Sequence, residues 1–150
     1  MNKCRITMLI VSSVLIISFL ACAPAATSPT PPAPEPVMVT VTCDQFSKEA
    51  HIVQEATAAV GSTITVTLCS NPTTGFSWGE QAKISDTAVL KQTSQKMVAA
   101  TTGMVGAPGN QEWTFEALKA GSDTASFSYS RPWEGGEKDV QTFKLHVTVQ

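Results

Sequence analysis

The sequence predicts an all-β fold, an immunoglobulin-like antiparallel β-sandwich with three binding loops at one end. Seven short segments are rich in β-branched and aromatic residues, and many of them alternate apolar with polar residues. Turn signals separate these segments, and about seven strands at such spacing are typical of this sandwich. The expected strands are residues 37–43, 47–57, 62–69, 86–93, 111–118, 124–130 and 143–149.

The N-terminus, residues 1–22, reads as an export signal. Lys3 and Arg5 precede an apolar run over 6–20, which is too short for a comfortable membrane span. The end of this run, Phe-Leu-Ala-Cys at 19–22, resembles a bacterial lipobox and predicts lipidation of Cys22, with a membrane-anchored lipoprotein at the cell envelope or surface as the result. An ordinary signal cleaved near Ala23 or Ala26, or an uncleaved anchor, would also place the domain outside the cell.

Residues 23–36 form a proline-rich linker, in which six of fourteen residues are proline. Proline fixes φ and lacks an N–H, so this stretch predicts a semi-rigid tether that spans about 40 Å at roughly 3.1 Å per residue. The folded domain then occupies residues 37–150, one domain's worth of chain, and we expect a monomer.

Charge and cysteine usage fit an exported domain. Without Lys3 and Arg5 the 10 basic residues become 8 against 12 acidic ones, which gives no indication of a nucleic-acid partner. Outside the signal and Cys22, only Cys43 and Cys69 remain, an even pair in an oxidising compartment. Cys69 is out of phase with the apolar residues of its strand, so a disulfide needs a bulge or a strand end there. Two free thiols are the alternative.

Alternation assigns the inward faces. In three of the expected strands the residues predicted to face the core are Ile64, Val66, Leu68, Phe127, Tyr129, Phe143, Leu145, Val147 and Val149, and His146 should face solvent. The connections between strands then gather at the two ends of the sandwich, where such domains bind partners.

Three of these connections have unusual compositions. In NPTTGF, residues 71–76, Asn71 can cap a turn that Pro72 stiffens, Gly75 permits positive φ, and Thr73 and Thr74 form the tip while Phe76 and Trp78 point inward. The glycine-rich stretch GMVGAPG, 103–109, lets backbone approach another surface closely, although such a loop is most often a plain connection. RPWE, 131–134, contains Arg and Trp, two residue types enriched at binding hot spots.

Catalysis finds no support in the sequence. The two histidines, His51 and His146, both fall in expected strands, and there is no GxSxG elbow, metal-spaced cluster or paired-carboxylate motif. Asp123 and Asp139 read as turn or edge charges. We therefore expect no enzyme activity, no metal and no cofactor.

The three loops together resemble the signature loops of the chagasin family of cysteine-peptidase inhibitors, and the resemblance covers roughly residues 37–150. It implies reversible, competitive inhibition of papain-like cysteine peptidases, with the first loop in the centre of the active-site cleft and the other two beside it. Thr73 and Thr74 would lie near the catalytic thiolate and histidine, and Trp133 on an aromatic surface of the peptidase. The implied contact residues are Asn71, Pro72, Thr73, Thr74, Gly75, Phe76, Gly103, Gly106, Ala107, Gly109, Arg131, Pro132, Trp133 and Glu134; Met104 and Val105 stay open.

Two other classes of function remain at this point. The same tether and loops could serve a surface-anchored recognition module without inhibitory activity, and the domain could be a structural immunoglobulin-like part of the cell envelope. A small hydrolase is a more distant alternative.

Overall fold

A computed structural model describes residues 34–100, 104 and 106–150, so the expected signal, the lipidation site Cys22 and most of the linker lie outside the described residues. The order of elements is β1 (Val37–Val41), α1 (Cys43–Lys48), β2 (His51–Ala58), β3 (Thr63–Ser70), the 3-10 turn η1 (Pro72–Thr74), β4 (Ser77–Trp78), β5 (Lys83–Ile84), β6 (Leu90–Val98), β7 (Gly109–Ala117), β8 (Gly121–Ser130) and β9 (Gln141–Val149). No helix in these ranges is long and apolar enough to cross a membrane.

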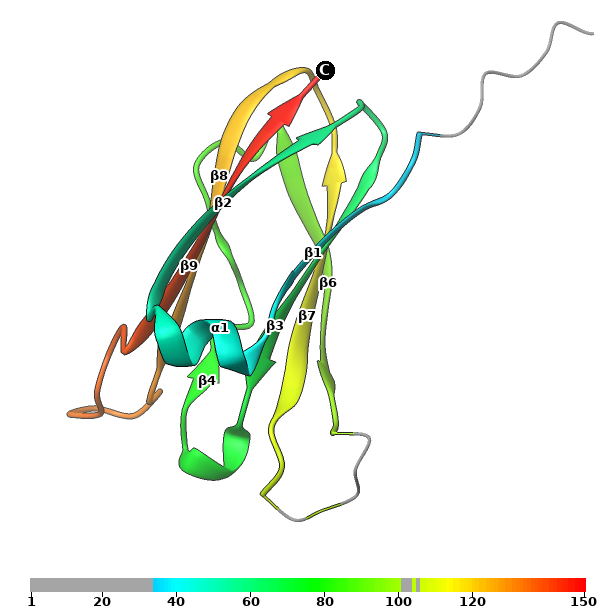
Figure 1. The fold of residues 1–150 in the computed structure, drawn as a ribbon. Coiled ribbons are helices and arrows are strands. Elements are labelled where there is room, and N and C mark those ends of the chain that lie inside the picture. Colours follow the sequence, from blue (N-terminus) through cyan, green and yellow to red (C-terminus); the bar gives the residue numbers. More distant parts are fainter. Residues whose placement is uncertain (1–33, 101–103, 105) are drawn as a thin grey trace, which may run out of the picture. The chain divides into compact units, whose positions relative to one another are not determined.

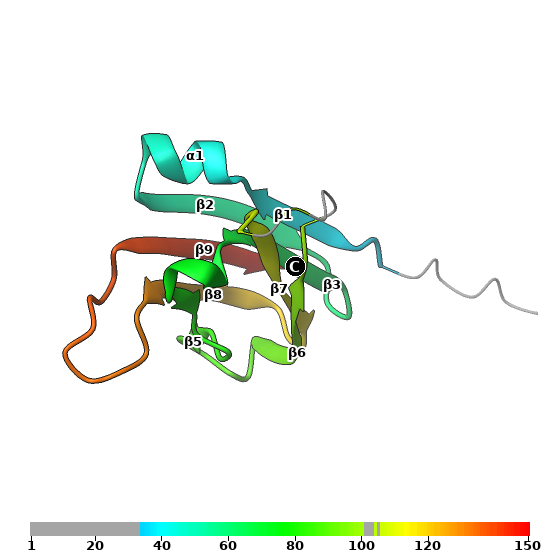
Figure 2. The ribbon, with the colours of Figure 1, turned by 90° about the horizontal axis from the view of Figure 1, so that it is seen from below.

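The strands form two packed sheets, which confirms the expected sandwich (Figures 1 and 2). One sheet has the order β1-β3-β7-β6, and the other has the order β2-β9-β8-β4, with β5 also paired to β8. Two of the ladders, β1 with β3 and β2 with β9, are parallel, whereas the expected sandwich was antiparallel throughout. These parallel pairs join strands that are distant in sequence, so the alternation within single strands carries no information about them.

The core lies between the sheets and contains every residue that alternation placed there. Trp113 and Phe127 meet edge to face with ring centroids 4.8 Å apart, and the ring centroids of Phe127 and Phe143 are 5.8 Å apart. Such aromatic pairs contribute about 0.5–1.5 kcal/mol beyond the area that they bury. His146 is exposed on β9, as expected.

A short helix replaces part of two expected strands. Thr42 caps α1: its hydroxyl accepts from the Gln45 N–H, and the Gln45 side chain accepts from the Thr42 N–H, a reciprocal capping box. The strand expected over 47–57 therefore begins only at His51. Phe46 of α1 is buried, and its ring centroid lies 5.2 Å from that of Trp78. The helix therefore covers the side of the sandwich where the chain passes from one sheet to the other (Figure 2).

The strand expected over 86–93 is shifted towards the C-terminus. Asp86 accepts from the Ala88 N–H through its side chain and from the Val89 and Leu90 N–H groups through its carbonyl, so it forms a turn. β6 begins only after this turn, at Leu90, and continues to Val98. An Asp that accepts hydrogen bonds from nearby backbone N–H groups competes with strand pairing, because those N–H groups are then not free to bond to a neighbouring strand.

Candidate functional site: three loops at one end

All three motif loops lie at the same end of the sandwich, the lower end in Figure 1, opposite the C-terminus. We call residues 71–76 loop 1, the β6–β7 connection over 99–108 loop 2, and the β8–β9 connection over 131–140 loop 3. Loop 2 includes residues 101–103 and 105, so Gly103 lies outside the described residues.

Loop 1 is a single capped turn that Asn71 organises. Asn71 is extended, with φ −121° and ψ 91°, and its side-chain oxygen accepts from the N–H and the hydroxyl of Thr73 at 3.2 and 2.6 Å. Its carbonyl accepts from the N–H and the hydroxyl of Thr74 at 3.2 and 2.7 Å. Gly75 ends the turn at φ 76°, a left-handed conformation that costs glycine little. Both hydroxyl protons are thus used within the loop, while Thr73 and Thr74 remain exposed at its tip.

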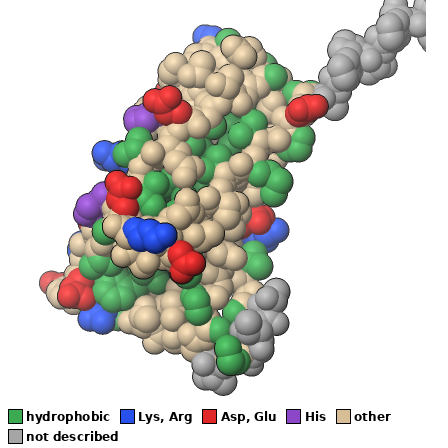
Figure 3. Space-filling model, in the orientation of Figure 1, with side chains coloured by type: hydrophobic (Ala, Val, Ile, Leu, Met, Phe, Trp, Pro, Cys, Tyr) green, Lys and Arg blue, Asp and Glu red, His purple; other side chains and the backbone are tan. Residues whose placement is uncertain are grey.

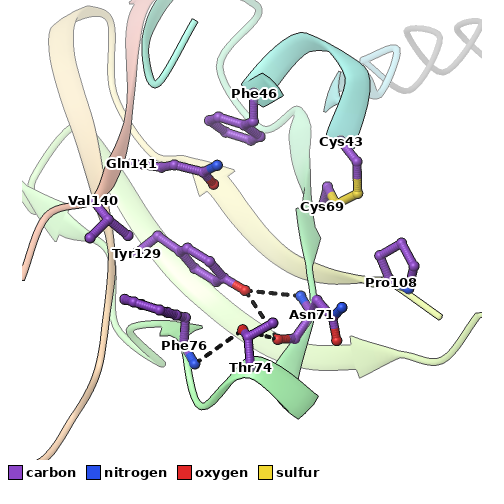
Figure 4. Close-up of a pocket in the computed structure, with 10 residues that line it drawn as sticks. All are labelled: Cys43, Phe46, Cys69, Asn71, Thr74, Phe76, Pro108, Tyr129, Val140 and Gln141. Carbon is purple, nitrogen blue, oxygen red and sulfur yellow. Dashed lines mark hydrogen bonds between the residues drawn. A yellow bond between two sulfur atoms is a disulfide. The ribbon is translucent and has the colours of Figure 1, made fainter. Parts of the chain in front are cut away.

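The base of loop 1 rests on the core. The Tyr129 hydroxyl accepts from the Asn71 N–H at 2.9 Å and lies 3.3 Å from the Asn71 carbonyl, to which it donates (Figure 4). Phe76 stacks on the Tyr129 ring with centroids 5.6 Å apart, and Trp78 is buried beneath it. Side chains of the folded core therefore fix the position of the turn.

Loop 3 holds an exposed tryptophan against loop 1. Trp133 is 51% exposed, and a Cβ built at Gly75 would lie only 2.8 Å from Cη2 of its ring. The Arg131 guanidinium lies over the Phe76 ring at 4.5 Å and 5.7 Å from the Trp133 ring, within the range of cation–π attraction. Glycine at position 75 is thus required twice, by its φ and by the neighbouring indole.

Hydrogen bonds within loop 3 limit its freedom. The Arg131 N–H donates to the Glu137 carbonyl at 2.8 Å, and the Gly136 N–H donates to the Trp133 carbonyl at 3.2 Å. Lys138 Nζ also donates to the Trp133 carbonyl, at 3.0 Å. Pro132 and Glu134 are exposed on either side of the tryptophan.

Among the described residues, loop 2 is joined to loop 1 by a hydrogen bond to its backbone. The Asn71 side-chain amide donates to the Gly106 carbonyl at 3.2 Å, and Gly106 has φ 86°. Ala107 is half-buried. Gly109 is buried within β7, where a Cβ would lie 2.4 Å from the Val98 carbonyl oxygen. Gly109 therefore allows the close approach of β6, and its side of the backbone is not open to a partner.

A disulfide lies directly behind loop 1. Cys43, the first residue of α1, is joined to Cys69 near the end of β3, with a Cα–Cα distance of 5.1 Å. A bulge or strand end was expected at Cys69, but Cys69 is paired with Asn110 inside β3; the strand that ends is β1, before Cys43. The bridge forms one wall of a cavity of about 470 Å³ between α1 and loop 1 (Figure 4), whose lining residues are Cys43, Phe46, Cys69, Asn71, Thr74, Phe76, Pro108, Tyr129, Val140 and Gln141.

Neither histidine belongs to these loops. The ring of His51 is hydrogen-bonded to the Thr142 hydroxyl at 3.0 Å, and that of His146 to the Thr124 hydroxyl at 2.8 Å. Over the described ranges no three His, Cys, Asp or Glu side chains are grouped so that they could hold a metal ion. The arrangement at the loop end is suited to docking.

Comparison with known proteins decides the family. The sequence profile described as "Chagasin family peptidase inhibitor I42" matches residues 57–147. The chain belongs to the chagasin family. It is 30% identical to chagasin of Trypanosoma cruzi over 101 residues, 66% of this chain and 92% of that protein, and 34% identical to amoebiasin-2 of Entamoeba histolytica over 87 residues, 58% of this chain and 70% of that protein.

Solved structures agree on the fold. The crystal structure of the cysteine protease inhibitor EhICP2 from Entamoeba histolytica superposes with a TM-score of 0.60 at 26% identity, covering 77% of this chain and 96% of that one. PbICP-C, solved in complex with falcipain-2, superposes with a TM-score of 0.55 at 18% identity, covering 75% and 99%. Members of the family are peptidase inhibitors, so this protein is an inhibitor and no enzyme.

Two residues that support the family's loops here were not singled out from the sequence. Tyr129 was expected in the core, but its hydroxyl also accepts a hydrogen bond from the Asn71 N–H at the base of loop 1. Lys138, which donates to the Trp133 carbonyl within loop 3, was not predicted to have a role. A tyrosine at the end of an inward-facing run is a usable signal, because a buried hydroxyl needs a polar partner. Nothing in the sequence marks Lys138.

Proposed function

We propose that this protein is a reversible, competitive inhibitor of papain-like cysteine peptidases, and that loops 1, 2 and 3 fill the active-site cleft together. One observation carries the proposal: the loops lie at one end of the sandwich and contact one another, through Asn71 with Gly106 and through Gly75 with Trp133. Family membership supports the peptidase class of the partner.

Loop 1 can occupy the cleft without being cleaved. A papain-like peptidase attacks a carbonyl that is presented to its thiolate and its oxyanion donors. In loop 1 the Asn71 carbonyl accepts from the N–H and the hydroxyl of Thr74 and from Tyr129, and the Pro72 carbonyl accepts from the Gly75 N–H at 3.1 Å. Presenting either of these two carbonyls to the enzyme would require these bonds to break, so neither is offered for attack.

The internal contacts also favour tight binding. Each rotamer-rich side chain that is immobilised on association costs about 0.5–1.5 kcal/mol, and loops that are already ordered avoid part of this cost. Loop 1 is held by Tyr129, and Trp133 already lies against Gly75. Trp133 would then act as the aromatic anchor of loop 3, a role for which tryptophan is enriched.

Titration of papain with the chain from Ala23 onward, using a small fluorogenic substrate, tests this function. We expect competitive inhibition by the wild type and a loss of at least about 30-fold in the variant with Ala at Thr73, Thr74 and Trp133, since hot-spot truncations cost 2 kcal/mol or more. Thr40→Ala, at an exposed position of β1, is the control and should leave Ki unchanged. No inhibition of papain or of two relatives at micromolar concentration would refute the function and favour a recognition module.

We further propose that the protein is exported and anchored by a lipid on Cys22, with residues 23–36 as the tether and a single inhibitor domain over 37–150 that remains monomeric. The positive N-terminus, the short apolar run and the lipobox-like sequence support this. In a bacterial host, mass spectrometry should find diacylglycerol on Cys22, and Cys22→Ser should move the protein from the membrane to the soluble fraction. A wild-type protein that is cleaved near Ala26 and found in the soluble fraction would contradict the lipid anchor. The molar mass from light scattering should be that of a monomer.

A further inference from the structure

An uncharged, apolar surface lies at the end of β6, where Met97 and Val98 adjoin residues of loops 1 and 2. It surrounds a cavity of about 320 Å³. We call this surface the β6 patch and define it by the lining residues Pro72, Met97, Val98, Ala99, Ala100 and Ala107.

The β6 patch exposes large apolar side chains in an unusual place. Met97 is 46% and Val98 37% exposed, and both lie on β6, an edge strand of its sheet. Met104, Trp133 and Val140 are also exposed at the loop end, whereas the other large exposed apolar side chains, such as Val60 and Leu118, lie elsewhere. Single exposed apolar residues need no explanation, but a contiguous group beside a binding loop marks an interaction surface.

Charge sets this flank apart from the flank at loop 3. The nearest charged residue on β6 is Lys96, and its ammonium is paired with the Glu112 carboxylate at 2.7 Å. On the face seen in Figure 3, charged side chains at the loop end gather over the β8–β9 connection, and the part over loop 1 is uncharged. The β6 patch therefore suits an apolar surface of the partner.

The size of the expected interface requires contacts beyond the motifs. A standard interface contains roughly 20–30 residues on each side, and the motif residues of loops 1, 2 and 3 are fewer. One of them, Gly109, is buried. The cavity behind loop 1 is a weaker extension, because two of its walls, Phe46 and Tyr129, are buried side chains that already belong to the core.

We propose that the β6 patch extends the inhibitory surface and receives an apolar side chain from the rim of the target peptidase's cleft, so that it helps to determine which peptidases are inhibited. The proposal rests on the proposed function, since the occupant is the same peptidase that loops 1, 2 and 3 bind. Methionine suits such a role, because its flexible side chain adapts to differently shaped partners.

Inhibition constants against papain and two relatives whose cleft rims differ in polarity test the patch. The variant combines Met97→Gln with Val98→Thr, which changes polarity and keeps the shape of both side chains. We expect Ki to rise about fivefold or more for at least one enzyme, and by different factors across the three. Met97→Leu should retain wild-type inhibition. Met38→Gln, at a 76% exposed methionine on β1, is the matched control and should have no effect.

The outcomes separate the two proposals. If the wild type inhibits and the double variant is unchanged against all three enzymes, the β6 patch is refuted and the inhibitory function stands. If the wild type inhibits none of them, both fall. If light scattering finds a wild-type dimer that the double variant dissociates while Ki stays constant, the patch is a contact between copies of this chain, and the proposal is overturned.

Discussion

Gly75→Ala isolates the contact between loops 1 and 3. Gly75 has φ 76°, and an added methyl would lie 2.8 Å from Trp133 Cη2. A side chain in the left-handed region costs about 1–2 kcal/mol, and the indole would have to move by roughly 0.7 Å to reach ordinary van der Waals separation. The loop should relax to another conformation when free, and binding must then restore the original one.

The expected effect on inhibition follows from that cost. If binding must repay about 1–2 kcal/mol, Ki for papain rises about 5- to 30-fold, and displacement of Trp133 adds to the loss. Gly61→Ala is the matched control: its φ is 83°, it lies in the β2–β3 turn at the other end of the sandwich, and a Cβ there would lie 3.5 Å from Pro34. This control should lower stability by a similar amount and leave Ki unchanged.

A double-mutant cycle with Trp133→Ala separates strain from the clash. In the alanine background the indole is absent, so Gly75→Ala should cost only the backbone strain, and the two substitutions should couple by at least about 0.5 kcal/mol. The reasoning is refuted if Gly75→Ala inhibits within twofold of wild type, or if the two losses simply add.

Three further predictions concern what supports the loops. Replacing both Cys43 and Cys69 by Ala should lower the free energy of unfolding, measured in urea melts, by about 3.5 kcal/mol, which is the loop-closure value for a separation of 26 residues. Reduction of the disulfide in the wild type should lower it by the same amount. Tyr129→Phe removes both hydrogen bonds to Asn71, so it should lower the free energy of unfolding by about 1 kcal/mol and weaken papain inhibition severalfold. A loss of stability with unchanged inhibition would show that Tyr129 does not position loop 1 for binding. Asp123→Ala should cost about 2–3 kcal/mol in the same melts with unchanged Ki, because its carboxylate accepts from the N–H groups of Ser85 and Asp86 near the β5–β6 connection.

The sequence predicted the parts of the fold that local patterns determine. Alternation placed residues such as Leu68 and Phe143 in the core, because period two follows from the geometry of a strand. It also predicted the capped turn at Asn71, since an Asn-Pro pair followed by Gly restricts the backbone strongly.

Other features needed information that local patterns lack or that was overlooked. Helix α1 was missed although Thr42 and Gln45 form a capping box, because the β-branched residues before and after it favoured strand. The parallel ladders depend on pairing between distant strands. Gly109 was assigned to binding, but its role at the β6–β7 contact becomes visible only when Val98 is in place. The contact of Trp133 with Gly75 likewise joins residues that are far apart in sequence.

The rigidity of the binding loops originates in the core. Tyr129 on β8 is hydrogen-bonded to Asn71 of loop 1 and stacks on the Phe76 ring. The ring centroids of Tyr129 and Trp78 are 5.0 Å apart, and the Trp78 indole N–H donates to the Cys69 carbonyl at 2.9 Å. Cys69 in turn is bonded to α1 through Cys43. A change at Tyr129, at Trp78 or at the disulfide should therefore alter the position of Asn71, although none of these residues is an expected peptidase contact. Substitutions in the core should therefore affect inhibition in proportion to their effect on this end of the sandwich, while substitutions of equal cost at the opposite end should affect stability alone.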